Sequence, residues 1–127
     1  MYKTILLIDD DVDEQFFFIE ALQKINTPVK FFFAHGAQEG LTLVKFLNPD
    51  FIFIDFNMPQ TNGIECLENI MHAGKHDHTK IIMYSTGLTD GLCEKALQKG
   101  ASKCIKKQSS IHDLINALEA FLKDEFL

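Results

Sequence analysis

Residues 50–63 read DFIFIDFNMPQTNG, a stretch in which a short apolar run ends on a carboxylate, Asp55. Four consecutive apolar residues, Phe51–Ile54, are typical of a strand that is covered on both faces in a parallel sheet. The Asn62-Gly63 pair ends the loop that follows. Ligands of such sheets bind at the carboxyl ends of the strands, so an ionisable side chain at this position is a candidate for chemistry.

Short apolar runs and helix-length segments alternate in the same way along the whole chain, and Ser110 is a candidate N-cap for the last helix. The runs expected to be strands are Thr4–Ile8, Val29–Ala34, Phe51–Ile54, Ile81–Tyr84 and Lys103–Ile105. This alternation predicts one α/β domain over residues 1–127. Its core would be a five-stranded doubly wound parallel sheet of the (βα)5 flavodoxin-like type, in the order 2-1-3-4-5.

The overall composition excludes several classes of partner. The 127 residues are 46% apolar, which is ordinary for a single packed domain. The formal net charge is -6, and a phosphate backbone or an anionic membrane is bound through clustered lysine and arginine. No apolar run approaches the roughly 18 residues of a membrane-spanning helix. We therefore expect a soluble, cytoplasmic protein that binds neither nucleic acid nor membrane.

Three cysteines, Cys66, Cys93 and Cys104, are an odd number without CxxC spacing. This pattern is typical of a reduced compartment and predicts no disulfide framework. Cys104 is expected to be a small apolar filler of the core rather than a reactive thiol.

Polar side chains gather where the expected strands end. They are Asp9, Asp10 and Asp11 after the first strand, Asp55 after the third, Ser85 and Thr86 after the fourth, and Lys106 and Lys107 after the fifth. The first and third strands are neighbours in the expected order, so their carboxylates would converge. Two carboxylates ~4 Å apart repel by about 4 kcal/mol at an effective dielectric constant of ~20. A divalent cation with oxygen ligands relieves this repulsion, and Mg²⁺ is the expected ion.

This set of groups is suited to phosphoryl transfer. A carboxylate such as Asp55 can act as a nucleophile toward phosphorus and form an aspartyl phosphate. The transferred group then needs its oxygens neutralised, which the metal and Lys107 can do, and Ser85 can donate a hydrogen bond to it.

Four motifs, ILLIDDD, DFIFIDFNMPQTNG, IIMYSTG and GASKCIKK, occur in an order that resembles the response-regulator receiver domain of two-component signalling. The resemblance covers essentially the whole chain. It implies that Asp55 is the phosphoacceptor, and that Asp9 and Asp10 are the acidic pair that binds Mg²⁺, with Asp10 the more direct ligand. It also implies that Asn57 contributes its backbone carbonyl to the metal. Asp11 falls outside the pair and is expected to be a solvated residue near the helix N-terminus.

The resemblance further implies that Ser85 is the switch hydroxyl and that Lys107 contacts the phosphoryl group. The chain would then be a stand-alone receiver, phosphorylated by a histidine kinase or a phosphotransfer protein and acting on another protein. It would catalyse only its own phosphorylation and dephosphorylation. Phe16, on the outer side of the first helix, is a candidate docking residue for the kinase. A homodimer is left open.

Two positions depart from the family pattern. The family usually has proline after the lysine, in a cis peptide bond, and this chain has Gln108. A cis bond before a non-proline residue costs ~2.5–4 kcal/mol, so we predict a trans bond and a re-routed loop. Cys104 stands where the family usually has the aromatic residue of the switch.

These departures keep an alternative open, namely an adaptor that has the receiver fold but works without phosphorylation. A second alternative is a phosphatase of the haloacid-dehalogenase type. That family also forms an aspartyl phosphate, and Asp9-x-Asp11, Ser85 and Lys107 mimic its motifs. It leaves the Asp55 motif unexplained.

Overall fold

The computed structural model describes residues 2–74 and 77–124. Along them, strands and helices alternate as the sequence predicts. The elements are β1 (Lys3–Ile8), α1 (Val12–Gln23), β2 (Val29–Ala34), α2 (Ala37–Leu47), β3 (Phe51–Ile54), α3 (Gly63–Ala73), β4 (Lys80–Ser85), α4 (Asp90–Gln98), β5 (Lys103–Lys106) and α5 (Ile111–Asp124). None of these helices is both long enough and apolar enough to cross a bilayer.

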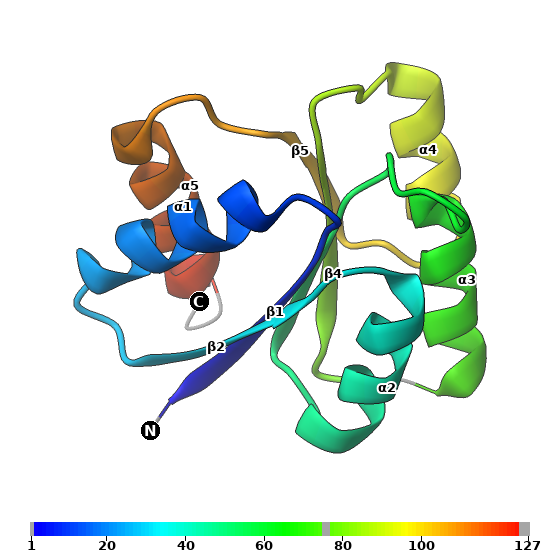
Figure 1. The fold of residues 1–127 in the computed structure, drawn as a ribbon, viewed down its shortest axis with the longest axis horizontal. Helices are drawn as coiled ribbons and strands as arrows, with labels where there is room; N and C mark the ends of the chain where they lie inside the picture. The colour runs from blue at the N-terminus through cyan, green and yellow to red at the C-terminus, as the bar shows by residue number, and fades with distance from the viewer. Residues whose placement is uncertain (1, 75–76, 125–127) are drawn as a thin grey trace.

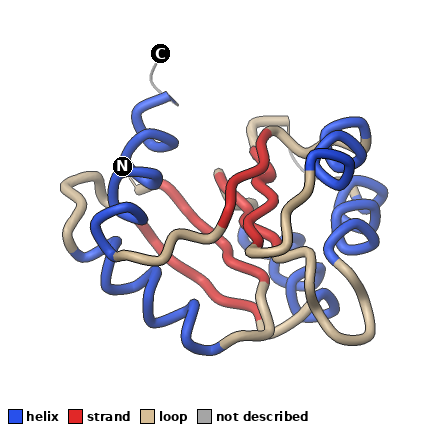
Figure 2. The backbone as a smooth tube through the Cα atoms, turned by 90° about the horizontal axis from the view of Figure 1, so that it is seen from above, coloured by secondary structure: helices blue, strands red, loops and turns tan. Residues whose placement is uncertain are grey.

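The strands form one parallel sheet in the order β2-β1-β3-β4-β5, which confirms the predicted fold. Helices α1 and α5 cover one face of the sheet, and α2, α3 and α4 cover the other (Figures 1 and 2). Ile8 pairs with Ile54 across β1 and β3, and Ser85 pairs with Lys106 across β4 and β5. The residues that follow these strands therefore meet at one edge of the sheet.

Because successive strand residues point to opposite faces, the sheet separates two cores of different composition. The core under α1 and α5 is aromatic: the ring of Phe18 packs edge-on against Phe53 and Tyr84, at centroid distances of 5.3 and 5.5 Å. The core under α2, α3 and α4 is mainly aliphatic and contains Ile52 and Met83. Phe16 lies outside both cores with 60% of its surface exposed, as its position on the helical wheel predicts.

Side-chain caps place the helix starts beside the sheet edge. Asp11 is exposed and accepts a hydrogen bond from the Asp13 backbone N–H at 2.9 Å, so it caps α1. Ser110 accepts one from the Asp113 N–H at 3.1 Å, which confirms the predicted cap of α5. Such caps satisfy N–H groups that a helix leaves unpaired.

The prediction of no disulfide is wrong for one pair of cysteines. The sulfur atoms of Cys93, on α4, and Cys104, on β5, are bonded, with their Cα atoms 5.9 Å apart. The number and spacing of the cysteines do not reveal this pair, because the two residues are 11 positions apart in sequence. The short connection from α4 to β5 brings them together in the fold. Cys104 does pack against the aliphatic core, but it is half-buried, whereas Cys66 is free and buried.

Gly63 allows the loop after β3 to close tightly behind Asp55. The Gly63 N–H donates to the Phe56 carbonyl oxygen at 2.9 Å. A Cβ atom at Gly63 would lie 2.5 Å from the Asp55 carbonyl oxygen and 2.6 Å from the Phe56 Cα. Both contacts are with backbone, which cannot rotate away, so a side chain here would displace the segment that carries Asp55.

We therefore expect Gly63→Ala to lower the free energy of unfolding by about 1–3 kcal/mol, the usual cost of overpacking. Gly91→Ala is the matched control, because Gly91 lies within α4 and a Cβ there meets nothing within 4 Å. Alanine at Gly91 should raise the free energy of unfolding by roughly 0.5–1 kcal/mol. Urea denaturation measures both changes, and equal effects of the two variants would contradict the packing argument.

Candidate functional site

Three carboxylates converge at the edge of the sheet where β1 and β3 end. Asp9, Asp10 and Asp55 each offer an oxygen atom, and these atoms lie within 4.8 Å of one another. Asp9 and Asp55 are buried and Asp10 is exposed, so the cluster opens to solvent on one side. Asp9 and Asp55 each follow directly on one of the paired residues Ile8 and Ile54, which is why the two carboxylates meet.

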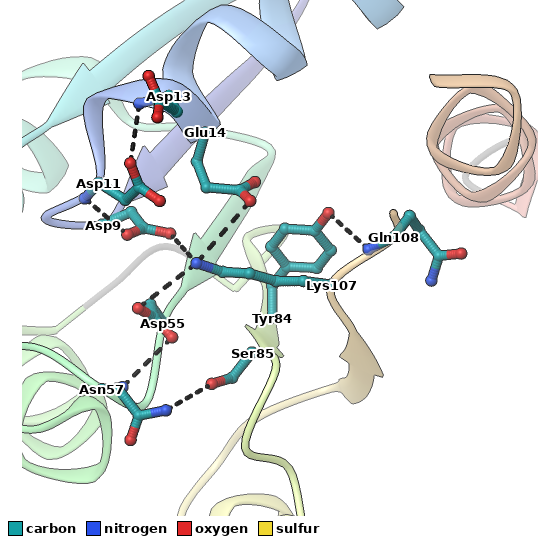
Figure 3. A network of polar contacts seen from close by, with 10 residues as sticks. All are labelled: Asp9, Asp11, Asp13, Glu14, Asp55, Asn57, Tyr84, Ser85, Lys107 and Gln108. Atoms are coloured by element: carbon teal, nitrogen blue, oxygen red, sulfur yellow. Dashed lines mark hydrogen bonds and ion pairs between the residues drawn. The ribbon is translucent and has the colours of Figure 1, made fainter. Parts of the chain in front are cut away.

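Lys107 brings a positive charge into this cluster. Its Nζ lies 2.8 Å from an oxygen of Asp9 and 3.6 Å from one of Asp55 (Figure 3). Burial disfavours the charged lysine, but the hydrogen bond and charge of Asp9 and the neighbouring acids outweigh it, so the pKa of Lys107 is raised. For Asp9, burial dominates and raises the pKa, although hydrogen bonds from Lys107 and the Asp11 N–H oppose it.

Asn57 and Ser85 complete the predicted set. The Asn57 N–H donates to Asp55 Oδ1 at 3.2 Å, and its side-chain amide donates to the Ser85 hydroxyl at 3.4 Å (Figure 3). The loop after β4 lies close to them, since a Cβ at Gly87 would come 3.0 Å from the Asn57 amide nitrogen. The structure thus brings Asp9, Asp10, Asp55, Asn57, Ser85 and Lys107 together at one edge of the sheet.

Glu14, which was not predicted from the sequence, places a third carboxylate beside the Lys107 ammonium, after those of Asp9 and Asp55. Its Oε1 lies 4.0 Å from the lysine nitrogen, and its Oε2 is buried without a hydrogen-bond partner among the described residues. Burial raises the pKa of Glu14, while the charge of Lys107 opposes the shift. Helical spacing could have revealed it, because Glu14 precedes the buried Phe18 by four residues and so shares its face.

A second contact that was not predicted from the sequence replaces the absent proline. No peptide bond of the described residues is cis, so the predicted trans bond before Gln108 is confirmed. The Gln108 N–H, which a proline would lack, donates to the buried hydroxyl of Tyr84 at 3.1 Å (Figure 3). The preceding Lys107 N–H donates to the Ser85 carbonyl oxygen at 3.2 Å. Two successive N–H groups therefore anchor the lysine's backbone to β4.

The donor set fits a hard divalent cation. Carboxylate oxygens from Asp9, Asp10 and Asp55 are the ligand type that Mg²⁺ prefers, and the exposed Asp10 leaves room for water ligands. One lysine cannot balance this many acids. Asp11 is outside the cluster and its side chain caps α1, so the geometry does not provide the Asp9-x-Asp11 pair of the phosphatase alternative.

Comparisons with known proteins agree with this geometry. The family model for the response regulator receiver domain matches residues 5–119. The chemotaxis protein CheY of Listeria monocytogenes is 31% identical over 115 residues, which are 88% of this chain and 95% of that protein. The protein-glutamate methylesterase/protein-glutamine glutaminase 1 of Methanosarcina mazei is 37% identical over 94 residues, or 72% of this chain. The match spans a quarter of that relative's length.

The fold matches solved structures over nearly its whole length. The response regulator domain of CheB from Thermotoga maritima superimposes with a TM-score of 0.83 at 26% identity. The alignment covers 98% of this chain and 96% of that one. The resemblance drawn from four sequence motifs is thereby confirmed.

Removing the Tyr84 hydroxyl tests the anchor of Lys107. Tyr84→Phe leaves the Gln108 N–H without its acceptor, and we expect the free energy of unfolding to fall by about 1 kcal/mol. Gln108→Pro removes the donor instead. If the two groups act on each other, the double variant should lose less than the sum of the single losses in urea denaturation. Strictly additive losses would show that the hydrogen bond contributes nothing.

Neutralising Glu14 tests the charge balance of the site. Because the pKa of Glu14 is raised in the folded protein, its ionised form costs stability above that pKa. Glu14→Gln should therefore raise the free energy of unfolding at neutral pH. The gain should disappear as the pH falls below the ordinary pKa of a glutamate, where the wild-type side chain is protonated in both states.

The matched control for this prediction is Glu20→Gln, on the exposed side of the same helix, where the carboxylate pairs with Lys24 at 3.8 Å. It should change stability little, as exposed pairs do. A Glu14→Gln variant that is less stable than wild type at neutral pH would show instead that attraction to Lys107 outweighs the cost of burial.

Proposed function

The chain belongs to the response-regulator receiver family, and from this premise we propose that Asp55 accepts a phosphoryl group from a phosphohistidine donor in a two-component phosphorelay. One observation carries the proposal: the Asp55 carboxylate lies at the edge of the sheet between two further acids and the ammonium group of Lys107. A nucleophile, a cation-binding set and a fixed positive charge are what transfer of a phosphoryl group to a carboxylate requires.

In the proposed reaction, an oxygen of Asp55 attacks phosphorus as the bond to the donor's imidazole nitrogen breaks. Lys107 then exchanges part of its contact with Asp9 and Asp55 for a contact with one phosphoryl oxygen, and the Ser85 hydroxyl donates a hydrogen bond to another. Mg²⁺, held by Asp9, Asp10, Asp55 and the Asn57 carbonyl, would supply charge neutralisation. Hydrolysis returns Asp55 to its unphosphorylated form: water attacks phosphorus, the bond to Asp55 breaks, and inorganic phosphate leaves.

On this proposal the chain is a switching module that catalyses only its own phosphorylation and dephosphorylation. Its donor is a histidine kinase or a phosphotransfer protein in the cytoplasm, and the exposed Phe16 on α1 is part of the surface that the donor meets. Its output passes to another protein.

Intact-mass spectrometry tests the central step. Wild-type protein incubated with Mg²⁺ and acetyl phosphate should gain the mass of one phosphoryl group, whereas Asp55→Asn should gain none, because an amide is no nucleophile toward phosphorus. Chelating the metal should abolish the gain in the wild type. Asp13→Asn is the matched control, since Asp13 is exposed on α1 and takes no part in the cluster; it should be phosphorylated like the wild type.

A wild type that stays unmodified under conditions in which its fold is intact would favour the adaptor alternative. Modification of Asp55→Asn to the wild-type level would place the acceptor on another residue. Steady release of phosphate from a phosphomonoester would instead support a phosphatase.

A further inference from the structure

A pair of cysteines links the two elements next to the acidic cluster. Cys93 lies in the first half of α4 and Cys104 in β5, where it pairs in register with Met83 of β4. Their Cα separation of 5.9 Å is within the range that a disulfide spans without moving the backbone. Both residues are half-buried, whereas Cys66 is fully buried, so an oxidant in solution reaches this pair first.

The surroundings of the pair also suit two free thiols. In the disulfide-bonded structure the Cys104 sulfur lies 3.7 Å from the carbonyl oxygen of Cys93, which would accept a hydrogen bond from the Cys104 thiol after reduction. The same side chain packs against the aliphatic core, so β5 keeps its place without the bond between the sulfurs. Both redox forms are therefore compatible with the fold.

The cross-link restrains the segment that contains Ser85. Only Thr86, Gly87 and Leu88 separate Ser85 from Thr89, the N-cap of α4, and Cys93 lies one turn further along that helix. Cys104 is three residues before Lys107. The disulfide between α4 and β5 therefore closes a covalent ring that contains neither Ser85 nor Lys107. It restrains α4, which follows Ser85, and β5, which precedes Lys107.

We propose that Cys93 and Cys104 form a site of reversible oxidation, whose substrate is a peroxide and whose oxidised form restrains α4 and the loop after β4. One thiol attacks a peroxide oxygen and breaks the O–O bond, which gives a sulfenic acid and water. The second thiol then displaces water from that sulfur and forms the disulfide. Two thiols and one hydrogen peroxide yield one disulfide and two waters, and a dithiol reductant reverses the change.

The consequence for signalling rests on the proposed function. Ser85 now accepts a hydrogen bond from Asn57, so it must turn, together with the loop after it, to donate to a phosphoryl group on Asp55. A disulfide that holds α4 in its present position opposes this movement. Oxidised protein should therefore be phosphorylated more slowly than reduced protein.

The first test needs no phosphorylation. The 127-residue protein is reduced, exposed to hydrogen peroxide, blocked with an alkylating agent and digested without reductant. We expect a linked peptide pair containing Cys93 and Cys104, formed equally in Cys66→Ala and absent from Cys104→Ser. Free thiols at Cys93 and Cys104 after oxidation, or cross-links only between separate molecules, would overturn the site.

Hydrogen exchange of the oxidised and reduced forms then tests the restraint. Amide exchange across residues 86–98 should be roughly tenfold slower in the oxidised protein, because the cross-link suppresses local opening. In Cys93→Ser, peroxide should leave exchange unchanged. Equal exchange in the two redox forms of the wild type would overturn the restraint even if the disulfide forms.

The rate of phosphorylation by acetyl phosphate distinguishes this inference from the proposed function. A slower rate in oxidised wild type, with no effect of oxidation on Cys93→Ser, is the expected result. Equal rates in both redox forms would refute the link to signalling and leave the receiver function intact. Absence of phosphorylation in both forms would refute the proposed function, while the peptide and exchange results still decide the oxidation site.

Discussion

The arrangement at the sheet edge depends on the ion pairs that the Lys107 ammonium group makes with the carboxylates around it. This ammonium group is one cation among the carboxylates of Asp9, Asp10, Asp55 and Glu14, at 2.8 Å from the first of these. Without it, buried acids within a few ångströms of one another would repel strongly or become protonated. The same shortage of positive charge makes this set of carboxylates suited to a hard divalent cation.

The sheet is what makes this arrangement rigid. The three central strands, β1, β3 and β4, are largely buried apolar runs covered by helices on both faces, so the residues at their ends have little freedom to separate. Backbone contacts fix the details: the Lys107 N–H donates to the Ser85 carbonyl, and Gly63 lets the loop after β3 fold against Asp55. A local charge cluster that is unfavourable by itself is thus maintained by packing elsewhere in the domain.

Most of the fold could be predicted from the sequence because its signals are local. Apolar runs such as Phe51–Ile54 coincide with the observed strands, and the order of a doubly wound sheet determines which strand ends meet. Five of the six predicted site residues lie at strand ends that this order brings together, and the sixth, Asn57, was implied by the family resemblance. Tyr84 and the Cys93–Cys104 pair were not predicted because each depends on a contact between elements whose distance no local pattern contains. Glu14 does have a local signal, its helical spacing to Phe18, but its contact with Lys107 is again one between distant elements.

The placement of Tyr84 gives the molecule an optical reporter of its own. The chain has no tryptophan and two tyrosines, of which Tyr2 is exposed near the N-terminus and Tyr84 is wholly buried. The phenol of Tyr84 lies in an aromatic core and touches the backbone beside Lys107. The tyrosine absorbance and emission of the unlabelled protein therefore contain one solvent-exposed contribution, from Tyr2, and one from Tyr84 that reports on the surroundings of the acidic cluster.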